Sequence, residues 1–132
     1  MKKLFVSVPM KGRTEEEIRA SIEKMKKIAE VYEGEELELI DSYIEDTPPE
    51  TNKQAIWYLG KSIEKLATAD VFIGIDDAWE WNGCYVEREV AGRYGIKGYC
   101  VKAEYVIENY RELMEKRYPV CCTVEPVGES NV

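Results

Sequence analysis

The feature that most constrains the fold is a regular alternation between short apolar runs and longer amphipathic segments. The apolar runs are rich in β-forming side chains and predict strands over residues 4–8, 37–40, 71–75, 98–101 and 120–124. The segments between them carry apolar residues at helical spacing and predict helices over 14–33, 56–69, 83–94 and 103–117. This alternation predicts an α/β fold, in which helices cover both faces of a parallel sheet.

The strand order follows from the common arrangements of such sheets. For five short strands, the doubly wound, flavodoxin/Rossmann-like order 2-1-3-4-5 is favoured, and the direction in which strands are added to the sheet reverses between the first and third strands. Ligands bind at the carboxyl ends of those two strands, which places residues 7–13 and 76–87 beside the expected crevice. A chain of 132 residues fits one domain, expected here over 1–124 with a tail at 125–132.

Composition excludes several functions. The net charge of -8 disfavours binding to a nucleic-acid polymer, and the absence of histidine excludes Ser-His and Cys-His nucleophiles and His-ligated metal sites. The four cysteines form no C-x-x-C pair and are interpreted as free thiols of a reducing cytoplasm. No apolar stretch reaches the ~18 residues of a membrane helix, and Pro9 and Lys11 interrupt the first apolar run. We therefore expect a cytoplasmic protein with no membrane contact, metal or organic cofactor.

The first crevice loop is poor in glycine, so it is neither a dinucleotide-binding nor a Walker loop. Lys11, Gly12 and Arg13 nevertheless stand just before a helix N-terminus, where backbone N–H groups and two cations favour one phosphate. A solvated basic turn beside an acidic helix start explains the same residues equally well.

The second crevice loop is acidic and carries two tryptophans, Trp79 and Trp81. We expect both rings to be exposed on this polar loop, which favours stacking on a nucleobase or sugar, or packing on a neighbouring subunit. Glu87 follows about one turn into the next helix, where the helix dipole favours its ionised form. An ionised carboxylate beside a sugar can attack the anomeric carbon, although a helix glutamate that only complements the dipole is commoner.

Three segments resemble the nucleoside 2-deoxyribosyltransferase family and its small bacterial and phage relatives, which include a deoxynucleotide N-hydrolase branch. They are residues 4–10 (LFVSVPM), 66–73 (L-x-x-ADVFI) and 81–87 (WNGCYVE) with the Val-Ala and Gly-Ile pairs that follow. Spread over residues 4–101, the resemblance covers about three quarters of the chain, and its order and spacing agree with the predicted fold.

The resemblance implies that Glu87 matches the nucleophile that forms a glycosyl-enzyme intermediate. It also implies that residues 41–43, which include Asp41, contact the base, and that Asp76 or Asp77 replaces a second aspartate. Two positions depart from the family pattern: Phe5 stands where many members have a tyrosine, and Ser62 stands near an aspartate that handles the base.

The first functional hypothesis is cleavage or transfer at the N-glycosidic bond of a (deoxy)nucleoside or nucleoside 5′-monophosphate. Glu87 is the expected nucleophile, and Asp76 or Asp41 the acid that protonates the departing base. The residues expected to contact the substrate are Phe5, Ser7, Pro9, Met10, Lys11, Gly12, Arg13, Asp41, Trp79, Trp81, Asn82 and Gly83. The departures at Phe5 and Ser62 favour a second hypothesis, a non-catalytic module that binds or sequesters a nucleotide. A third, a purely structural protein, leaves the tryptophan loop unexplained.

Aromatic residues outside the predicted strands also predict a homo-oligomer. Trp57, Tyr58, Trp79 and Trp81 fall in helices or loops, where a small domain is expected to bury some of them against a second copy.

Overall fold

Four parallel strands form one sheet in the computed structural model, which describes residues 1–117 apart from the side chains at 79, 116 and 117. The order is β2-β1-β3-β4, with bounds β1 Lys3–Val6, β2 Glu38–Leu39, β3 Val71–Ile75 and β4 Lys97–Val101. The predicted α/β class, parallel pairing and order are confirmed for these strands. The expected fifth strand at 120–124 and the tail at 125–132 lie outside the described residues.

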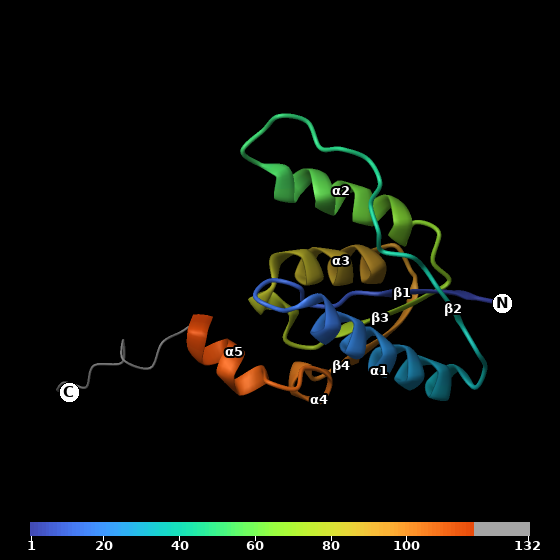
Figure 1. Ribbon diagram of the computed structural model, residues 1–132. Helices are drawn as coiled ribbons and strands as arrows, with labels where there is room; N and C mark the ends of the chain where they lie inside the picture. The colour runs from blue at the N-terminus through green and yellow to red at the C-terminus, as the bar shows by residue number, and fades with distance from the viewer. Residues whose placement is uncertain (118–132) are drawn as a thin grey trace, which may run out of the picture.

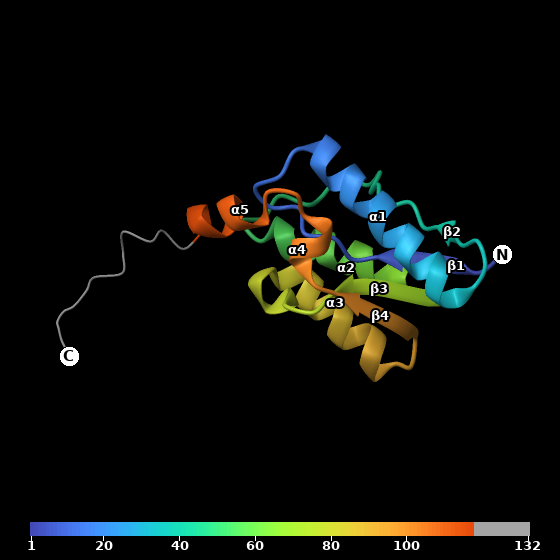
Figure 2. The ribbon, with the colours of Figure 1, turned by 90° about the horizontal axis from the view of Figure 1, so that it is seen from below.

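Helices cover both faces of this sheet (Figures 1 and 2). On one side lie α1 Glu15–Glu33, α4 Ala103–Val106 and α5 Tyr110–Arg117, and on the other lie α2 Gln54–Leu66 and α3 Asn82–Arg93. A short 3₁₀ turn, η1 Ala78–Glu80, joins β3 to α3. None of the helices within residues 1–117 combines the length and the apolar character needed to cross a bilayer.

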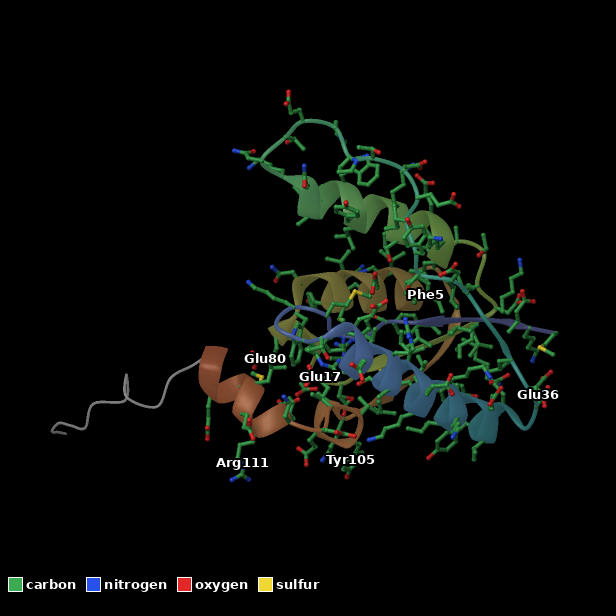
Figure 3. All side chains as sticks on the ribbon, viewed as in Figure 1. Phe5, Glu17, Glu36, Glu80, Tyr105 and Arg111 are labelled. Atoms are coloured by element: carbon green, nitrogen blue, oxygen red, sulfur yellow. The ribbon has the colours of Figure 1, made fainter. Side chains whose placement is uncertain are left out.

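The two faces of the sheet hold separate apolar cores, because side chains alternate along each strand. Leu4 and Ile73 point toward α1, where they pack with Met25. Phe5 and Phe72 point toward α2 and α3, and their rings stack with centroids 6.1 Å apart. Figure 3 shows Phe5 on this side of the sheet.

Gly74 is required by the second core. A Cβ atom at this position would lie 2.8 Å from the ring of Phe72, too close for any other residue. The absence of a side chain at Gly74 therefore lets the Phe72 ring lie over β3. The Cβ of Ser7 is the next nearest atom, 3.7 Å from the same position.

The predicted start and end of α1 are confirmed. Thr14 and Glu17 form a reciprocal capping box, in which each side chain accepts a hydrogen bond from the backbone N–H of the other. Gly34 ends the helix with a φ of 75°, the left-handed conformation that glycine adopts without strain.

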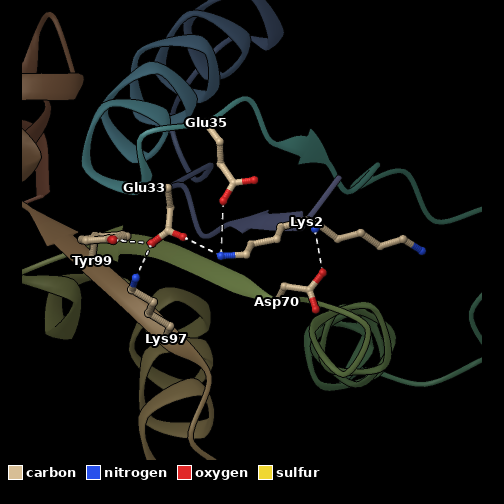
Figure 4. A network of polar contacts seen from close by, with 7 residues as sticks. Lys2, Glu33, Glu35, Asp70, Lys97 and Tyr99 are labelled. Atoms are coloured by element: carbon tan, nitrogen blue, oxygen red, sulfur yellow. Dashed lines mark hydrogen bonds and ion pairs between the residues drawn. The ribbon is translucent and has the colours of Figure 1, made fainter.

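A buried carboxylate fastens the far end of α1 to β4 and to the residue before β1 (Figure 4). The side chain of Glu33 is 1% exposed and contacts Lys97 Nζ at 2.8 Å, Lys2 Nζ at 3.3 Å and the hydroxyl of Tyr99. Hydrogen bonds from Lys97 and Tyr99 lower the pKa of Glu33 to about 2, although desolvation opposes them. The network therefore joins α1 to β4 and to the residue that precedes β1.

The prediction of one helix over 103–117 is wrong, because the segment divides into α4 and α5. Ile107 is buried in the core and has an extended backbone, with φ of -114° and ψ of 109°. The Ser21 hydroxyl donates to the carbonyl of Val106, which would otherwise accept from the next helical turn. A tertiary hydrogen bond and the burial of one side chain therefore outweigh a continuous helical pattern.

Candidate active site

Three elements bring polar side chains together at one carboxylate. Glu87 projects from α3, and its Oε1 accepts a hydrogen bond of 2.6 Å from the hydroxyl of Ser7, which follows β1. Its Oε2 accepts a second bond of 2.6 Å, from the hydroxyl of Ser62 on α2. Both oxygens of the predicted nucleophile are thus fixed by neutral donors.

The sheet explains why this carboxylate lies at the predicted crevice. Ser7 continues the ladder between the first and third strands, since its N–H donates to the carbonyl of Ile73 at 2.8 Å. The site therefore lies at the carboxyl end of β1, where the strand order reverses and where α/β sheets bind ligands.

Glu87 is further into α3 than the helix dipole reaches. The helix begins at Asn82, so Glu87 lies beyond the first turn, where the dipole effect fades. Burial raises the pKa of Glu87, and hydrogen bonds from Ser62 and Ser7 oppose that rise. The two serines, rather than the helix N-terminus, are the groups that favour its ionised form.

Cys84 and Ser62 are the residues at this site that sequence reasoning did not place there. Cys84 lies three residues before Glu87, is buried, and has a thiol that interacts with Ser7. Burial raises the pKa of this thiol to about 12, so it remains protonated at neutral pH and is no competing nucleophile. Its spacing from Glu87 on the helix was the available signal. For Ser62 the sequence showed only a departure from the family pattern.

Two aromatic residues expected to contact the substrate are core residues. Trp81 is 5% exposed and packs in the α1-side core, so the prediction of an exposed ring is wrong for it. Phe5 is also buried, against Phe72 and α3. The cause is local: the η1 turn directs the chain so that Trp81 closes the core just before α3 begins.

Arg13 does not point into the crevice. Its Nη1 donates to the carbonyl of Pro9 at 2.8 Å, and its Nη2 donates to the carbonyl of Glu17 and the hydroxyl of Ser21. Desolvation by burial lowers its pKa. The guanidinium therefore joins the loop after β1 to α1, contrary to its expected role at a phosphate.

The rest of that turn is divided between structure and solvent. Gly12 has a φ of 79°, and a Cβ atom there would lie 3.3 Å from Leu113. Pro9 is buried, whereas Met10 and Lys11 are exposed. Lys11 is therefore the basic side chain that this turn exposes to solvent. The capping box already uses the backbone N–H of Glu17 at the start of α1.

The predicted acids take separate positions. Asp76 is exposed at the carboxyl end of β3, where its carbonyl accepts from Arg88 Nη1 at 2.6 Å. Asp77 accepts instead from the hydroxyl of Tyr110 at 2.9 Å and from the backbone of Ala103, so it holds α4 and α5 to this loop.

Asp41 is exposed after β2, where it accepts from the backbone of Tyr43. It lines a groove of about 700 Å³ between that loop and α2, and neither Glu87 nor its two serines line this groove. At the start of α3, Asn82 is exposed and Gly83 is half-buried.

Known proteins provide no assignment for this site. No protein-family model, curated protein or solved structure matches the chain significantly. Within residues 1–117, no group of three or more histidine, cysteine, aspartate or glutamate side chains is arranged to hold a metal ion.

A half-buried carboxylate with both oxygens fixed can serve in two ways. Each oxygen accepts one hydrogen bond and keeps a free lone pair, with which it can attack an electrophilic carbon. Alternatively, the carboxylate can hold Ser7 and Ser62 in place beside a bound ligand and take part in no reaction.

Proposed function

We propose that the protein cleaves or transfers the N-glycosidic bond of a (deoxy)nucleoside or nucleoside 5′-monophosphate, with Glu87 as the nucleophile. The observation that carries the proposal is the position of Glu87, a half-buried carboxylate fixed by Ser7 and Ser62 where the strand order reverses. The resemblance of three segments to the nucleoside 2-deoxyribosyltransferase family supports the same reaction.

The proposed reaction has two displacement steps. Glu87 attacks C1′ of the sugar, a C1′–O bond forms, and the C1′–N bond breaks with its electron pair leaving on the base. An acid protonates the departing base, and Asp76 is our candidate because it is exposed at the carboxyl end of β3, beside β1. Water or a second base then attacks C1′ and releases Glu87.

The test is incubation with a panel of nucleosides and 5′-monophosphates, with released base measured by chromatography. Glu87→Gln keeps the size of the side chain but removes the attacking charge, and it should reduce the rate by about 10²–10³, the order seen when one catalytic group is removed. Glu89→Gln is the matched control, since Glu89 lies on the same helix and pairs with Arg93.

A sugar adduct gives a second measurement. With a slow substrate, the peptide that contains Glu87 should increase in mass by one sugar, and Glu87→Gln should show no increase. Wild-type protein that releases no base from any compound of the panel contradicts the enzymatic proposal.

A specific observation favours the alternative, a nucleotide-binding module without catalysis. Both oxygens of Glu87 already accept hydrogen bonds, and Phe5 stands where many members of the family that the sequence resembles have a tyrosine, so that hydroxyl is missing. For this alternative, calorimetry should find nucleotide binding without base release, and Glu87→Gln should bind equally well.

We also propose self-association through exposed apolar side chains of α2 and α3. Ile56 on α2 is 65% exposed, and Tyr58 on α2 and Tyr85 on α3 are exposed as well. Exposed apolar side chains of this size commonly mark a surface that another protein molecule covers.

A further inference from the structure

The hydroxyl of Ser7 has one hydrogen, and Glu87 accepts it. The Ser7 oxygen lies 2.6 Å from Oε1 of the carboxylate, which has no hydrogen of its own when it is ionised. A serine oxygen also has lone pairs that can accept a hydrogen bond. Ser7 is only 1% exposed, so a donor for these lone pairs has to come from the protein interior rather than from bulk water.

Cys84 is such a group. It lies on α3 three residues before Glu87, a spacing that places both side chains on the same face of the helix. The side chain of Cys84 is buried and forms a hydrogen bond with that of Ser7. One buried hydroxyl is therefore in contact with both a thiol and a carboxylate of the same helix.

The direction of the bond between Cys84 and Ser7 follows from the count of hydrogens. Because the hydrogen of Ser7 is already donated to Glu87, the thiol has to be the donor. Burial raises the pKa of the Cys84 thiol to about 12, and the charge of Glu87 acts in the same direction, while that of Arg13 opposes it. The thiol therefore keeps its hydrogen at neutral pH and can donate it.

We propose that Cys84 is a positioning residue for Glu87: its S–H donates to the oxygen of Ser7, and the hydroxyl of Ser7 donates to Oε1. In such a chain each hydrogen bond polarises the next and strengthens it by about 10–30%. The chain therefore favours the ionised form of Glu87 and fixes the direction in which the Ser7 hydroxyl points. Only its consequence for catalysis rests on the proposed function.

The first measurement needs no ligand. The side-chain carboxyl carbon of Glu87, assigned with Glu87→Gln, is titrated by NMR in wild type and variants. Ser7→Ala should raise the midpoint by about one pH unit, the order expected for a lost hydrogen bond to a charged group. Cys84→Ala should raise it by roughly 0.1–0.3 of a pH unit, the share of that bond that the chain adds. Cys84→Ser should lower the midpoint, because a hydroxyl is a stronger donor than a thiol.

These signs separate the relay from simple packing. If Cys84 only fills space, the smaller alanine lets water closer to Glu87, and the midpoint should fall or stay the same. A midpoint in Cys84→Ala that is unchanged or lowered therefore overturns the proposal. Cys100→Ala is the matched control, because it removes an exposed thiol on β4, and it should leave the midpoint unchanged.

A double-mutant cycle shows whether Cys84 acts through Ser7. In the Ser7→Ala background, Cys84→Ala should produce no further shift in the midpoint of Glu87, because the link between the two groups is gone. A shift as large as that in the wild-type background would mean that the thiol acts on Glu87 by another route, and it would contradict the relay.

Infrared spectroscopy keeps the proposal testable if thermal melts show that an alanine variant does not fold. The S–H stretching band of Cys84 is assigned from the difference between wild type and Cys84→Ser. Its frequency should fall as Glu87 ionises, because the carboxylate draws on the Ser7 hydrogen and makes the Ser7 oxygen a better acceptor. The same pH change should leave the band in place in Glu87→Gln. A wild-type band that does not respond to the ionisation of Glu87 overturns the proposal.

The last measurement uses the nucleoside that the panel finds to be cleaved. The acid limb of kcat/KM reports the ionisation of Glu87 in the free protein, so it should move up in Cys84→Ala and down in Cys84→Ser, as the NMR midpoints do. An acid limb that ignores these midpoints contradicts the nucleophilic role of Glu87 and leaves the relay standing. If no compound is cleaved, the proposed function fails, and the titration and the cycle still decide the role of Cys84.

Discussion

Glu87 is a carboxyl group kept in a place where its charge is costly. Burial raises its pKa, and the two serine hydroxyls only partly compensate. In water the same group would be ionised at little cost, so a residue of this kind reduces stability for the sake of a reactive position. This cost can be measured directly.

We expect Glu87→Gln to raise the Tm at pH 7. A carboxyl whose folded-state pKa lies above its unfolded value favours folding below the unfolded pKa, and that contribution is lost as the pH rises through the folded pKa. Glutamine has no charge to bury, so the gain should be present at pH 7 and should shrink at pH 4. Thermal melts of the variant and wild type at both values test this, with Glu89→Gln as control. A lower Tm for Glu87→Gln at pH 7 would show that the serine bonds outweigh burial.

At the scale of elements, the turn before α1 has a sequence typical of a binding site but a structural role. The Lys11-Gly12-Arg13 turn has the composition of a phosphate site, yet Arg13 uses its donors on Pro9, Glu17 and Ser21. Its role is to close the loop after β1 onto the helix that follows.

Arg13→Ala should therefore destabilise the protein by about 1–3 kcal/mol, the range for hydrogen bonds of a charged donor. Urea unfolding measures this loss. In the binding experiment, Lys11→Ala should weaken the binding of a nucleoside 5′-monophosphate more than the binding of its nucleoside. If Arg13→Ala folds, it should weaken the binding of both compounds equally. A phosphate-specific loss in Arg13→Ala would restore Arg13 as a phosphate ligand.

The sequence predicted those elements whose signals are local. The capping residues Thr14 and Gly34 and the alternating pattern were sufficient for α1 and for the order of the four strands. It failed where a distant residue decides the local structure, as at Val106, whose carbonyl is taken by Ser21 from α1.

The residues of the candidate site were likewise predictable only where the signal was local in the sequence. Glu87 could be selected from its position and from the resemblance, and Ser7 from its place after the first strand. The hydroxyl of Ser62 could not be found, because its contact with Glu87 depends on how α2 packs across α3.

At the scale of the whole molecule, Glu33 couples the ends of several elements. Its pKa of about 2 lies below the usual value of 4.5 because Lys97 and Tyr99 hydrogen-bond to its carboxylate. A depressed carboxyl pKa contributes stability above the unfolded value, and that contribution is lost as the pH falls toward the folded value.

Glu33→Gln should therefore lower the Tm at pH 7 and flatten its dependence on pH between about 4.5 and 2, the interval between the two pKa values. Melts across that range test the prediction, with Glu35→Gln as control because Glu35 is partly exposed and forms an ion pair with Lys2. If the Tm of Glu33→Gln depends on pH in the same way as that of the wild type, other groups cause the loss of stability in acid.

The exposed apolar side chains of α2 and α3 lead to the remaining prediction. Light scattering of the wild type should give a mass above the 15.2 kDa of one chain. Ile56→Asp should shift the population toward the 15.2 kDa monomer, because it places a charge among the exposed apolar side chains of α2. Thr51→Asp, at an exposed position before the helix, is the control. A wild-type protein of 15.2 kDa at all concentrations would show that these side chains remain uncovered by a second copy.

The position of β1 in the sheet affects how the chain is made. This strand comes first but lies between β2 and β3, and Leu4 pairs with Val71. At about 5–20 residues per second, a ribosome needs roughly 3–13 s to reach residue 71 after residue 4, and more to release it from the exit tunnel. During that interval the apolar segment around Phe5 has no completed sheet to join. Newborn chains therefore pass through a period in which chaperones can bind this segment, and faster translation of the first 75 codons would shorten it.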